Sequence, residues 1–192
     1  MGQAANRYPQ GIQPVELPPL TRSADLPPLT RVALLVDYPV LLRAVRATAP
    51  ETVPRLGDMV QRARTLGGVF IARAYGAWYD IDEATAAFTA GLDPVFVPPA
   101  GPGNVPTTGS LINDGLGLVR EQRVEALALS GDDRLLPLLA AAHEAGLPVA
   151  LIAHACQPDG PCLALAASAE PAAAFARPMT RAERYRRSPS VA

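Results

Sequence analysis

Short apolar runs alternate along this chain with stretches in which apolar residues recur at helical spacing. The clearest case is the segment 124–139, VEALALSGDDRLLPLL. Residues 125–129 are mostly apolar, as expected for a strand buried on both faces, and the polar letters SGDD end that run. Leucines then resume at helical spacing, with Pro137 in the first turn or two, where a missing N–H is tolerated. The segment predicts a buried strand, a turn in which Ser130 or Asp132 caps the next helix, and that helix.

The same alternation extends over most of the chain. Four further apolar runs predict strands at 32–37, 69–75, 94–97 and 149–153. One helical stretch is predicted to start near 38, and a second helix follows the break at Pro50 and Pro54 and ends near 66. Further helices are predicted at 81–90, from a cap at Thr107 or Thr108 to 122, and at 163–176. This order indicates an α/β fold, a Rossmann-like parallel sheet of about five strands with helices on both faces.

Acidic residues directly follow two of the predicted strands. Asp37 ends the first strand, and Asp132 and Asp133 follow the fourth. In sheets of this kind the strand order usually reverses beside the first strand, and ligands bind at the carboxyl ends of the strands there. If the first and fourth strands are neighbours, these acids face one crevice. We therefore expect Asp37 to meet Asp132 and Asp133.

A crevice lined by carboxylates predicts a bound cation. Carboxylates in one crevice repel one another, and oxygen-only ligands suit Mg²⁺ or Mn²⁺. Such an ion can activate water for phosphodiester hydrolysis. The alternative interpretation is structural: Asp132 caps a helix, and Asp37 is a solvated charge at a strand end.

Length and composition limit the other possibilities. With 192 residues, 49% of them hydrophobic, the chain predicts one domain over 31–176, a Pro-rich extended arm over 1–30 and an Arg-rich tail over 177–192. No apolar run reaches the length of about 18 residues that a membrane span needs, and the N-terminus lacks the apolar core of a secretory signal. A cytoplasmic location is therefore the expectation. The chain contains no lysine, which excludes lysine-dependent catalysis.

The N-terminal arm contains one motif twice. LPPLTR occurs at 17–22 and again at 26–31. Pro-Pro pairs favour polyproline II and exclude helix, so we expect the arm to be extended. Its leucines either dock on the domain or on a neighbouring subunit, or belong to a disordered leader. The Arg-rich tail is likewise either a contact for RNA or for an acidic partner, or a solvated end.

Cys156 and Cys162 are the only cysteines in the sequence. Without a nearby pair of histidines they do not form the usual structural zinc site. Two reduced thiols are expected in the cytoplasm, and a disulfide that closes the loop between them is the alternative.

Several segments resemble the NYN branch of the PIN-like nuclease superfamily. LLVD, which ends at Asp37, is similar to the family's first strand with its leading aspartate. GVFIARAYGAW (68–78) and GLDPVFVP (91–98) resemble its second and third strands, and SGDDRLLPLLAAAHEAGLPVALIA (130–153) is similar to its SGD segment and following strand. The resemblance covers about 31–175. It implies a PIN-like Rossmann-type fold and a Mg²⁺-dependent ribonuclease.

The chain departs from the family pattern at charged positions. The family's lysine and the aspartate of its third helix fall near Asn104 and Thr108, and its second aspartate after SGD falls at Arg134. Because Mg²⁺ is held largely by charge, two carboxylates beside an arginine bind it less well than four carboxylates would. Arg134 is also able to pair with Asp37 or Asp132 in place of an ion.

Two functions follow from these observations. The first is an RNA-acting NYN-type protein, a ribonuclease that depends on Mg²⁺ or Mn²⁺ or a weakened descendant of one. The second is a non-catalytic NYN-fold module that recruits partners, or copies of itself, through its terminal arms. For the first function the expected catalytic acids are Asp37, Asp132 and Asp133, the expected metal ligands are Asp37, Asp132 and Asp114, and the expected nucleic-acid contacts are Arg73, Trp78 and Arg134.

Overall fold

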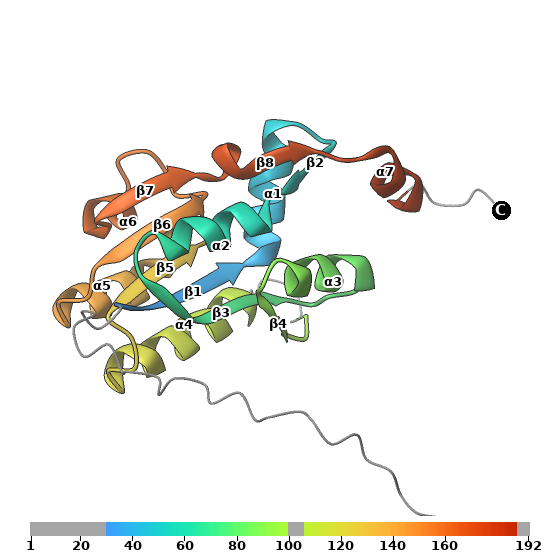
Figure 1. Ribbon diagram of the computed structural model, residues 1–192. Coiled ribbons are helices and arrows are strands. Elements are labelled where there is room, and N and C mark those ends of the chain that lie inside the picture. The colour runs from blue at the N-terminus through green and yellow to red at the C-terminus, as the bar shows by residue number, and fades with distance from the viewer. Residues whose placement is uncertain (1–29, 100–105, 188–192) are drawn as a thin grey trace, which may run out of the picture.

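The computed structural model describes residues 30–99 and 106–187, and its centre is a parallel sheet of six strands (Figure 1). The strands lie in the order β4-β3-β1-β5-β6-β7, and all neighbouring pairs are parallel. The condition for a shared acidic crevice, that the first predicted strand neighbours the fourth, is met because β1 lies between β3 and β5. The strand bounds are β1 (Arg31–Asp37), β3 (Gly68–Gly76), β4 (Asp93–Phe96), β5 (Ala126–Ser130), β6 (Val149–His154) and β7 (Ser168–Pro171).

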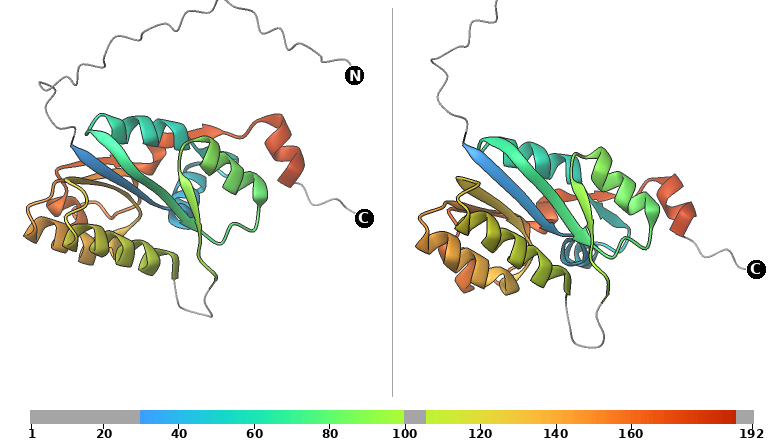
Figure 2. Two further views of the ribbon diagram at one scale, coloured as in Figure 1. Left: turned by 60° about the horizontal axis from the view of Figure 1, so that its bottom comes forward. Right: turned by 90° about the horizontal axis from the view of Figure 1, so that it is seen from below.

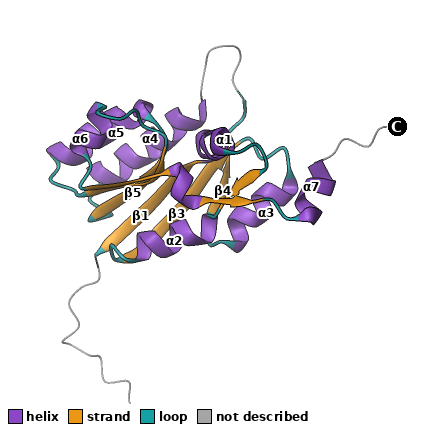
Figure 3. Ribbon diagram, turned by 90° about the horizontal axis from the view of Figure 1, so that it is seen from above, coloured by secondary structure: helices purple, strands orange, loops and turns teal. Residues whose placement is uncertain are grey.

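Helices cover both faces of this sheet (Figures 2 and 3). One face carries α1 (Tyr38–Thr48), α2 (Leu56–Arg64) and α3 (Ile81–Thr89), and the other carries α4 (Pro106–Arg120), α5 (Leu136–Glu144) and α6 (Pro161–Leu165). Residues 32–36 of β1 are all apolar because both faces of the strand are covered. Val32, Leu34 and Val36 pack with the first group of helices, and Ala33 and Leu35 pack with the second. The predicted Rossmann-like α/β fold is therefore confirmed.

The segment that follows β6 corrects one prediction. The alanine-rich stretch 163–176 predicts a helix, but α6 ends at Leu165 and the chain continues into β7 and a short 3-10 helix, η2 (Ala172–Phe175). The N–H of Ala167 donates to the carbonyl of Val149, next to the start of the pairing with β6. Pro171 cannot continue a helix, whereas its missing donor costs little in an edge strand. Sheet pairing therefore outweighs the helix propensity of alanine, and the sheet has six strands rather than about five.

A small antiparallel sheet ties the C-terminal segment to the loop after α1. In it, β2 (Thr52–Pro54) pairs with β8 (Ala176–Pro178), which leads into α7 (Arg181–Arg187). Arg177 donates two hydrogen bonds, of 2.7 and 3.0 Å, to the carboxylate of Glu183 and lowers the pKa of Glu183 to about 2. Residues 177 and 178, which the sequence assigned to the tail, thus belong to a strand.

The start of α4 also differs from the prediction. The helix begins at Pro106, so Thr107 and Thr108 lie inside its first turn and neither is the cap. Proline suits the first helical position because its φ angle is already helical and its missing N–H would have no partner there. Both threonines are buried. The hydroxyl of Thr108 points instead to Asp37.

Several predictions concern residues outside the described ranges. These are the LPPLTR arm up to residue 29, the loop 100–105 and the last five residues, 188–192. Within the described ranges, no helix combines the length and the hydrophobicity that crossing a bilayer requires.

Candidate acidic site at the strand ends

Asp37 ends β1 and caps α1. Its Oδ1 accepts a hydrogen bond from the N–H of Val40 at 3.3 Å, and its Oδ2 accepts one from the hydroxyl of Thr108 at 2.5 Å. The side chain is fully buried, so Asp37 is not a solvated strand-end charge. Burial raises the pKa of Asp37, although both hydrogen bonds and the nearby Arg134 act to lower it. Donors from the protein itself therefore occupy the oxygens that the sequence assigned to a metal.

Asp132 follows the neighbouring strand and caps the 3-10 helix η1 (Asp133–Leu135). Its Oδ1 accepts from the N–H of Arg134 at 3.2 Å, and the Arg134 guanidinium donates two further bonds, of 2.8 and 2.7 Å, to the same carboxylate. Burial raises the pKa of Asp132, but these bonds more than offset that effect and leave the pKa below its ordinary value. This is the salt bridge that the sequence offers as the alternative to a bound ion.

Asp37 and Asp132 lie close enough to interact. Val36 and Ser130 are partners across β1 and β5, so the two strands end side by side. The charge of Asp132 raises the pKa of Asp37 and the charge of Arg134 lowers it, both by less than burial does. The structure thus brings two of the predicted acids to one sheet edge and places an arginine beside them.

Asp133 faces a different group of residues. Its Oδ2 accepts from the N–H of Gln157 at 3.0 Å, in the loop that follows β6. Cys156 and Cys162, which lie beside it, are free thiols in the structure. Asp132 and Asp133 are consecutive in the turn but contact different neighbours. Asp133 therefore does not substitute for the second aspartate of the family pattern.

Asp114 joins α4 to β3. Its Oδ2 accepts from Nη1 of Arg73 at 2.9 Å and from the hydroxyl of Tyr75 at 2.8 Å. Burial and the bond to this carboxylate raise the pKa of Tyr75 above its ordinary value. The partners of Asp114 lie on β3 and differ from those of Asp37, which are Val40 and Thr108. The predicted RNA contact Arg73 is engaged with Asp114.

Trp78, one of the expected nucleic-acid contacts, is held by neighbours in the fold. Its backbone is left-handed, with φ of 47°, and its indole N–H donates to the carbonyl of Val95 at 2.8 Å. Its ring contacts that of Tyr38, with the centroids 4.8 Å apart. These contacts indicate that Trp78 packs within the fold rather than forming a surface for RNA.

Thr108 is the part of this site that sequence reasoning missed. It belongs to α4, and it contacts Asp37 only because that helix packs beneath the end of β1. The available signal was the family pattern, in which an acid falls near Thr108. The Thr108 hydroxyl donates a hydrogen bond to the Asp37 carboxylate, whereas an acid at position 108 would repel that carboxylate.

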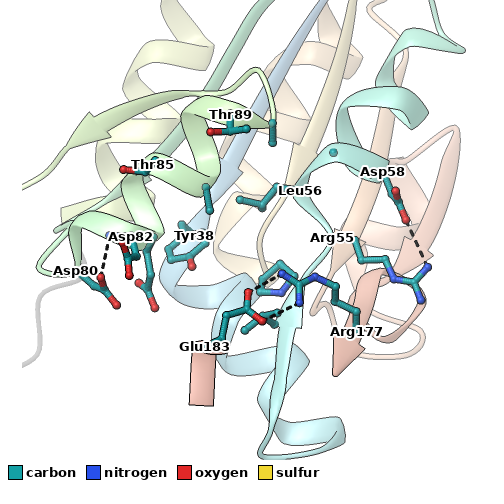
Figure 4. A pocket seen from close by; sticks show the side chains of 16 residues that line it. Tyr38, Arg55, Leu56, Asp58, Asp80, Asp82, Thr85, Thr89, Arg177 and Glu183 are labelled. Atoms are coloured by element: carbon teal, nitrogen blue, oxygen red, sulfur yellow. Dashed lines mark hydrogen bonds and ion pairs between the residues drawn. The ribbon is translucent and has the colours of Figure 1, made fainter. Parts of the chain in front are cut away.

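A groove of about 730 Å³ lies next to this site rather than at it (Figure 4). Tyr38 and Leu56 lie at its centre. The acidic residues of the crevice do not line it. Asp80, Asp82, Thr85 and Thr89 stand on one side in Figure 4, and the ion pairs Arg55–Asp58 and Arg177–Glu183 stand on the other. A ligand in this groove would contact α3 and the β2–β8 sheet, not Asp37 or Asp132.

Comparisons with known proteins agree with the fold. No protein-family model and no curated protein sequence matches this chain. Among solved structures, the chain is similar to VPA0982, a protein of unknown function from Vibrio parahaemolyticus, with a TM-score of 0.58 and 15% identity over 73% of this chain and 91% of that one. A glycosyltransferase, SnogD from Streptomyces nogalater, aligns at a TM-score of 0.35 and 15% identity over 66% of this chain and 34% of that one, which supports no argument. The first similarity establishes the fold alone.

Proposed function

We propose that this protein is a non-catalytic interaction module on a Rossmann-like fold, related to NYN nucleases, in which an internal cation has replaced the metal. The observation that carries this proposal is the salt bridge between the Arg134 guanidinium and the Asp132 carboxylate, beside Asp37. An arginine that neutralises one of only two carboxylates removes the main attraction for a divalent ion.

The environment of Asp37 supports the same conclusion. A ligand to Mg²⁺ must be ionised and must reach the ion, yet Asp37 is fully buried and each of its oxygens accepts a hydrogen bond from the protein. Burial also raises its pKa, which favours the protonated form that binds no metal. An ion would therefore have to reach a buried carboxylate that already accepts two hydrogen bonds, and it would have to displace Arg134 from Asp132.

A second candidate function is a weak ribonuclease that depends on Mg²⁺ or Mn²⁺. It is favoured by one observation: Asp37 and Asp132 meet at the carboxyl edge of β1 and β5, where parallel sheets usually place their sites. In this case Arg134 would release Asp132 when an ion enters. The two candidates differ in a measurable way, because only the second gives cleavage that depends on Asp37.

The first test is cleavage of single-stranded RNA with Mn²⁺, with the wild-type protein and Asp37→Asn at equal concentration. We expect no cleavage above background from either protein. Cleavage by the wild-type protein that Asp37→Asn abolishes would contradict the proposal and establish the ribonuclease.

The second test restores an acid at position 134. Mn²⁺ should leave the melting temperature of the wild-type protein unchanged and should raise that of Arg134→Asp, because binding to the folded state stabilises it by mass action. Arg64→Asp, an exposed position on α2, makes the same change in charge and should show no Mn²⁺ effect. A rise for the wild-type protein would count against replacement of the metal by Arg134.

The interaction itself is assigned to the N-terminal arm. Its two LPPLTR motifs carry four leucines next to Pro-Pro pairs, a sequence that favours polyproline II. Ile81 and Phe88 of α3 and Phe96 of β4 are 63–76% exposed, and they offer apolar surface for such leucines from a second copy of the chain.

This assignment is tested by oligomeric state. Substitution of the four motif leucines by serine (Leu17, Leu20, Leu26 and Leu29) should lower the mass measured by analytical ultracentrifugation to that of a monomer. The matched control substitutes Ile12 and Val15, apolar residues of the arm outside the motifs. A wild-type protein that is monomeric at high concentration would refute self-association through the arm.

A further inference from the structure

A second cluster of potential ligands lies beside the acidic site. It consists of Asp133 at the start of η1, Cys156 in the loop after β6, and Cys162 in α6. One carboxylate oxygen and both sulfur atoms lie within 4.8 Å of one another. Asp133 is distant in sequence from the two cysteines, and the pairing of β5 with β6 brings it to them.

One atom of this cluster has no partner in the described structure. Oδ1 of Asp133 is buried and forms no hydrogen bond with any described residue. Leaving a buried carboxylate oxygen without a donor is costly, so native structures normally supply a donor or a cation. Gly160 leaves room at this oxygen, since a Cβ atom at that position would lie only 3.0 Å from it. A side chain at position 160 would therefore crowd this unpaired oxygen, and glycine avoids that contact.

The surrounding backbone holds the cluster in place. The other carboxylate oxygen of Asp133 accepts from the N–H of Gln157, and the sulfur of Cys162 donates to the Asp133 carbonyl at 3.5 Å. The N–H of Cys156 donates to Nδ1 of His154 at 3.2 Å. These bonds bind the loop after β6 to the exit of β5, so the three donor atoms are positioned before any ligand arrives.

We propose that Asp133, Cys156 and Cys162 bind a thiophilic divalent cation of the zinc class. Two sulfurs and one carboxylate oxygen suit Zn²⁺ and Co²⁺, whereas Mg²⁺ and Mn²⁺ prefer oxygen ligands alone. Three protein ligands leave a fourth tetrahedral position for water or another small ligand.

The geometry requires only a small adjustment. Zinc–ligand distances near 2.0–2.3 Å place tetrahedral donor atoms about 3.6–3.8 Å apart, so a spread of 4.8 Å must contract by about 1 Å. The cysteines bind as thiolates, and two thiol protons pass to solvent as the ion enters. The bound ion links the loop after β6 and α6 to the end of β5.

The test is titration with Co²⁺ of the full-length, metal-free protein kept reduced by a phosphine. We expect one equivalent to bind, with sulfur-to-cobalt charge-transfer absorption in the near ultraviolet. Zn²⁺ should abolish that absorption and excess Mg²⁺ should not. Saturation without the sulfur band, or no binding, would overturn the proposal.

Variants assign the ligands. Cys156→Ser and Cys162→Ser should each weaken the sulfur band and reduce Co²⁺ affinity at least about tenfold, and Asp133→Asn should reduce the affinity by a similar factor. Asp159→Asn is the matched control, because this exposed aspartate lies in the same loop with φ of 62°, which asparagine tolerates. Circular dichroism of the metal-free variants establishes that they fold. Equal losses for Asp133→Asn and Asp159→Asn would refute a specific role for Asp133.

Discussion

At the scale of single residues, the hydrogen bonds of Asp37 and its burial have opposite effects on its ionisation. It caps α1 and accepts the hydroxyl bond of Thr108, and both contacts favour the ionised carboxylate. Burial works against that form and has the larger effect, so the pKa of Asp37 lies above its ordinary value. The folded protein therefore holds a proton on this group at pH values where the unfolded chain has released it.

This difference predicts a dependence of stability on pH. As pH rises from 3.8 through the raised pKa of Asp37, the folded state binds more protons than the unfolded state, so the free energy of unfolding contributed by this group falls. Asp37→Asn keeps a good N-cap and removes this titration. In urea unfolding between pH 4 and pH 7, the stability of the variant relative to the wild-type protein should increase with pH. A constant difference across that range would show that Asp37 titrates normally.

At the scale of secondary-structure elements, α4 depends on a close approach to α5. Gly115 faces Leu138, and a Cβ atom at position 115 would lie 2.5 Å from Cδ2 and 2.8 Å from Cδ1 of that leucine. Leu138 is fully buried, so it has little room to move. The same helix supplies Thr108 and Asp114, and the glycine therefore sets the position from which α4 reaches β1 and β3.

Two alanine substitutions in α4 should have effects of opposite sign. Gly115→Ala overpacks the core against Leu138 and should lower the free energy of unfolding by about 1–2 kcal/mol, even after the gain in helix propensity. A Cβ atom at position 117 has no neighbour within 4 Å, so Gly117→Ala should raise the free energy of unfolding by about 0.5–1 kcal/mol. Guanidinium unfolding of both variants measures the difference. A stabilised Gly115→Ala variant would mean that the two helices are not in close contact.

At the scale of the whole molecule, the C-terminal segment is part of the folded unit. Phe175 packs into the core formed with α1 and α2, and its carbonyl accepts from the N–H of Arg55 at 2.7 Å. The β2–β8 pairing continues this contact. The chain therefore closes over the same face of the sheet on which its first helix lies, as Figure 1 shows.

Loss of the Phe175 ring should destabilise the whole domain rather than release the segment alone. Phe175→Ala removes a ring that is only 6% exposed and should lower the free energy of unfolding by about 3–4 kcal/mol in a single cooperative transition. Phe70→Ala, at a ring 56% exposed on β3, should change the free energy of unfolding by less than about 0.5 kcal/mol. Separate transitions by fluorescence and circular dichroism would indicate that the segment unfolds independently.

Local patterning in the sequence determined most of the strands, the helices between them and the α/β class. A strand covered on both faces must be apolar at successive positions, as residues 32–36 are, and this signal does not depend on distant residues. The usual strand order of such sheets led to the expectation that Asp37 meets Asp132, and the sequence offered Arg134 as a partner of either acid. Arg134 pairs with Asp132, two residues away, an interaction that needs no distant part of the chain.

Only the tertiary structure decided what else each side chain meets. Thr108 reaches Asp37, and Arg73 and Tyr75 reach Asp114, because α4 packs beneath β1 and β3. Edge pairing made a strand of the alanine-rich residues 168–171, where local propensity favoured helix. These contacts join segments distant along the chain, and their energies come from packing and burial that no local pattern encodes.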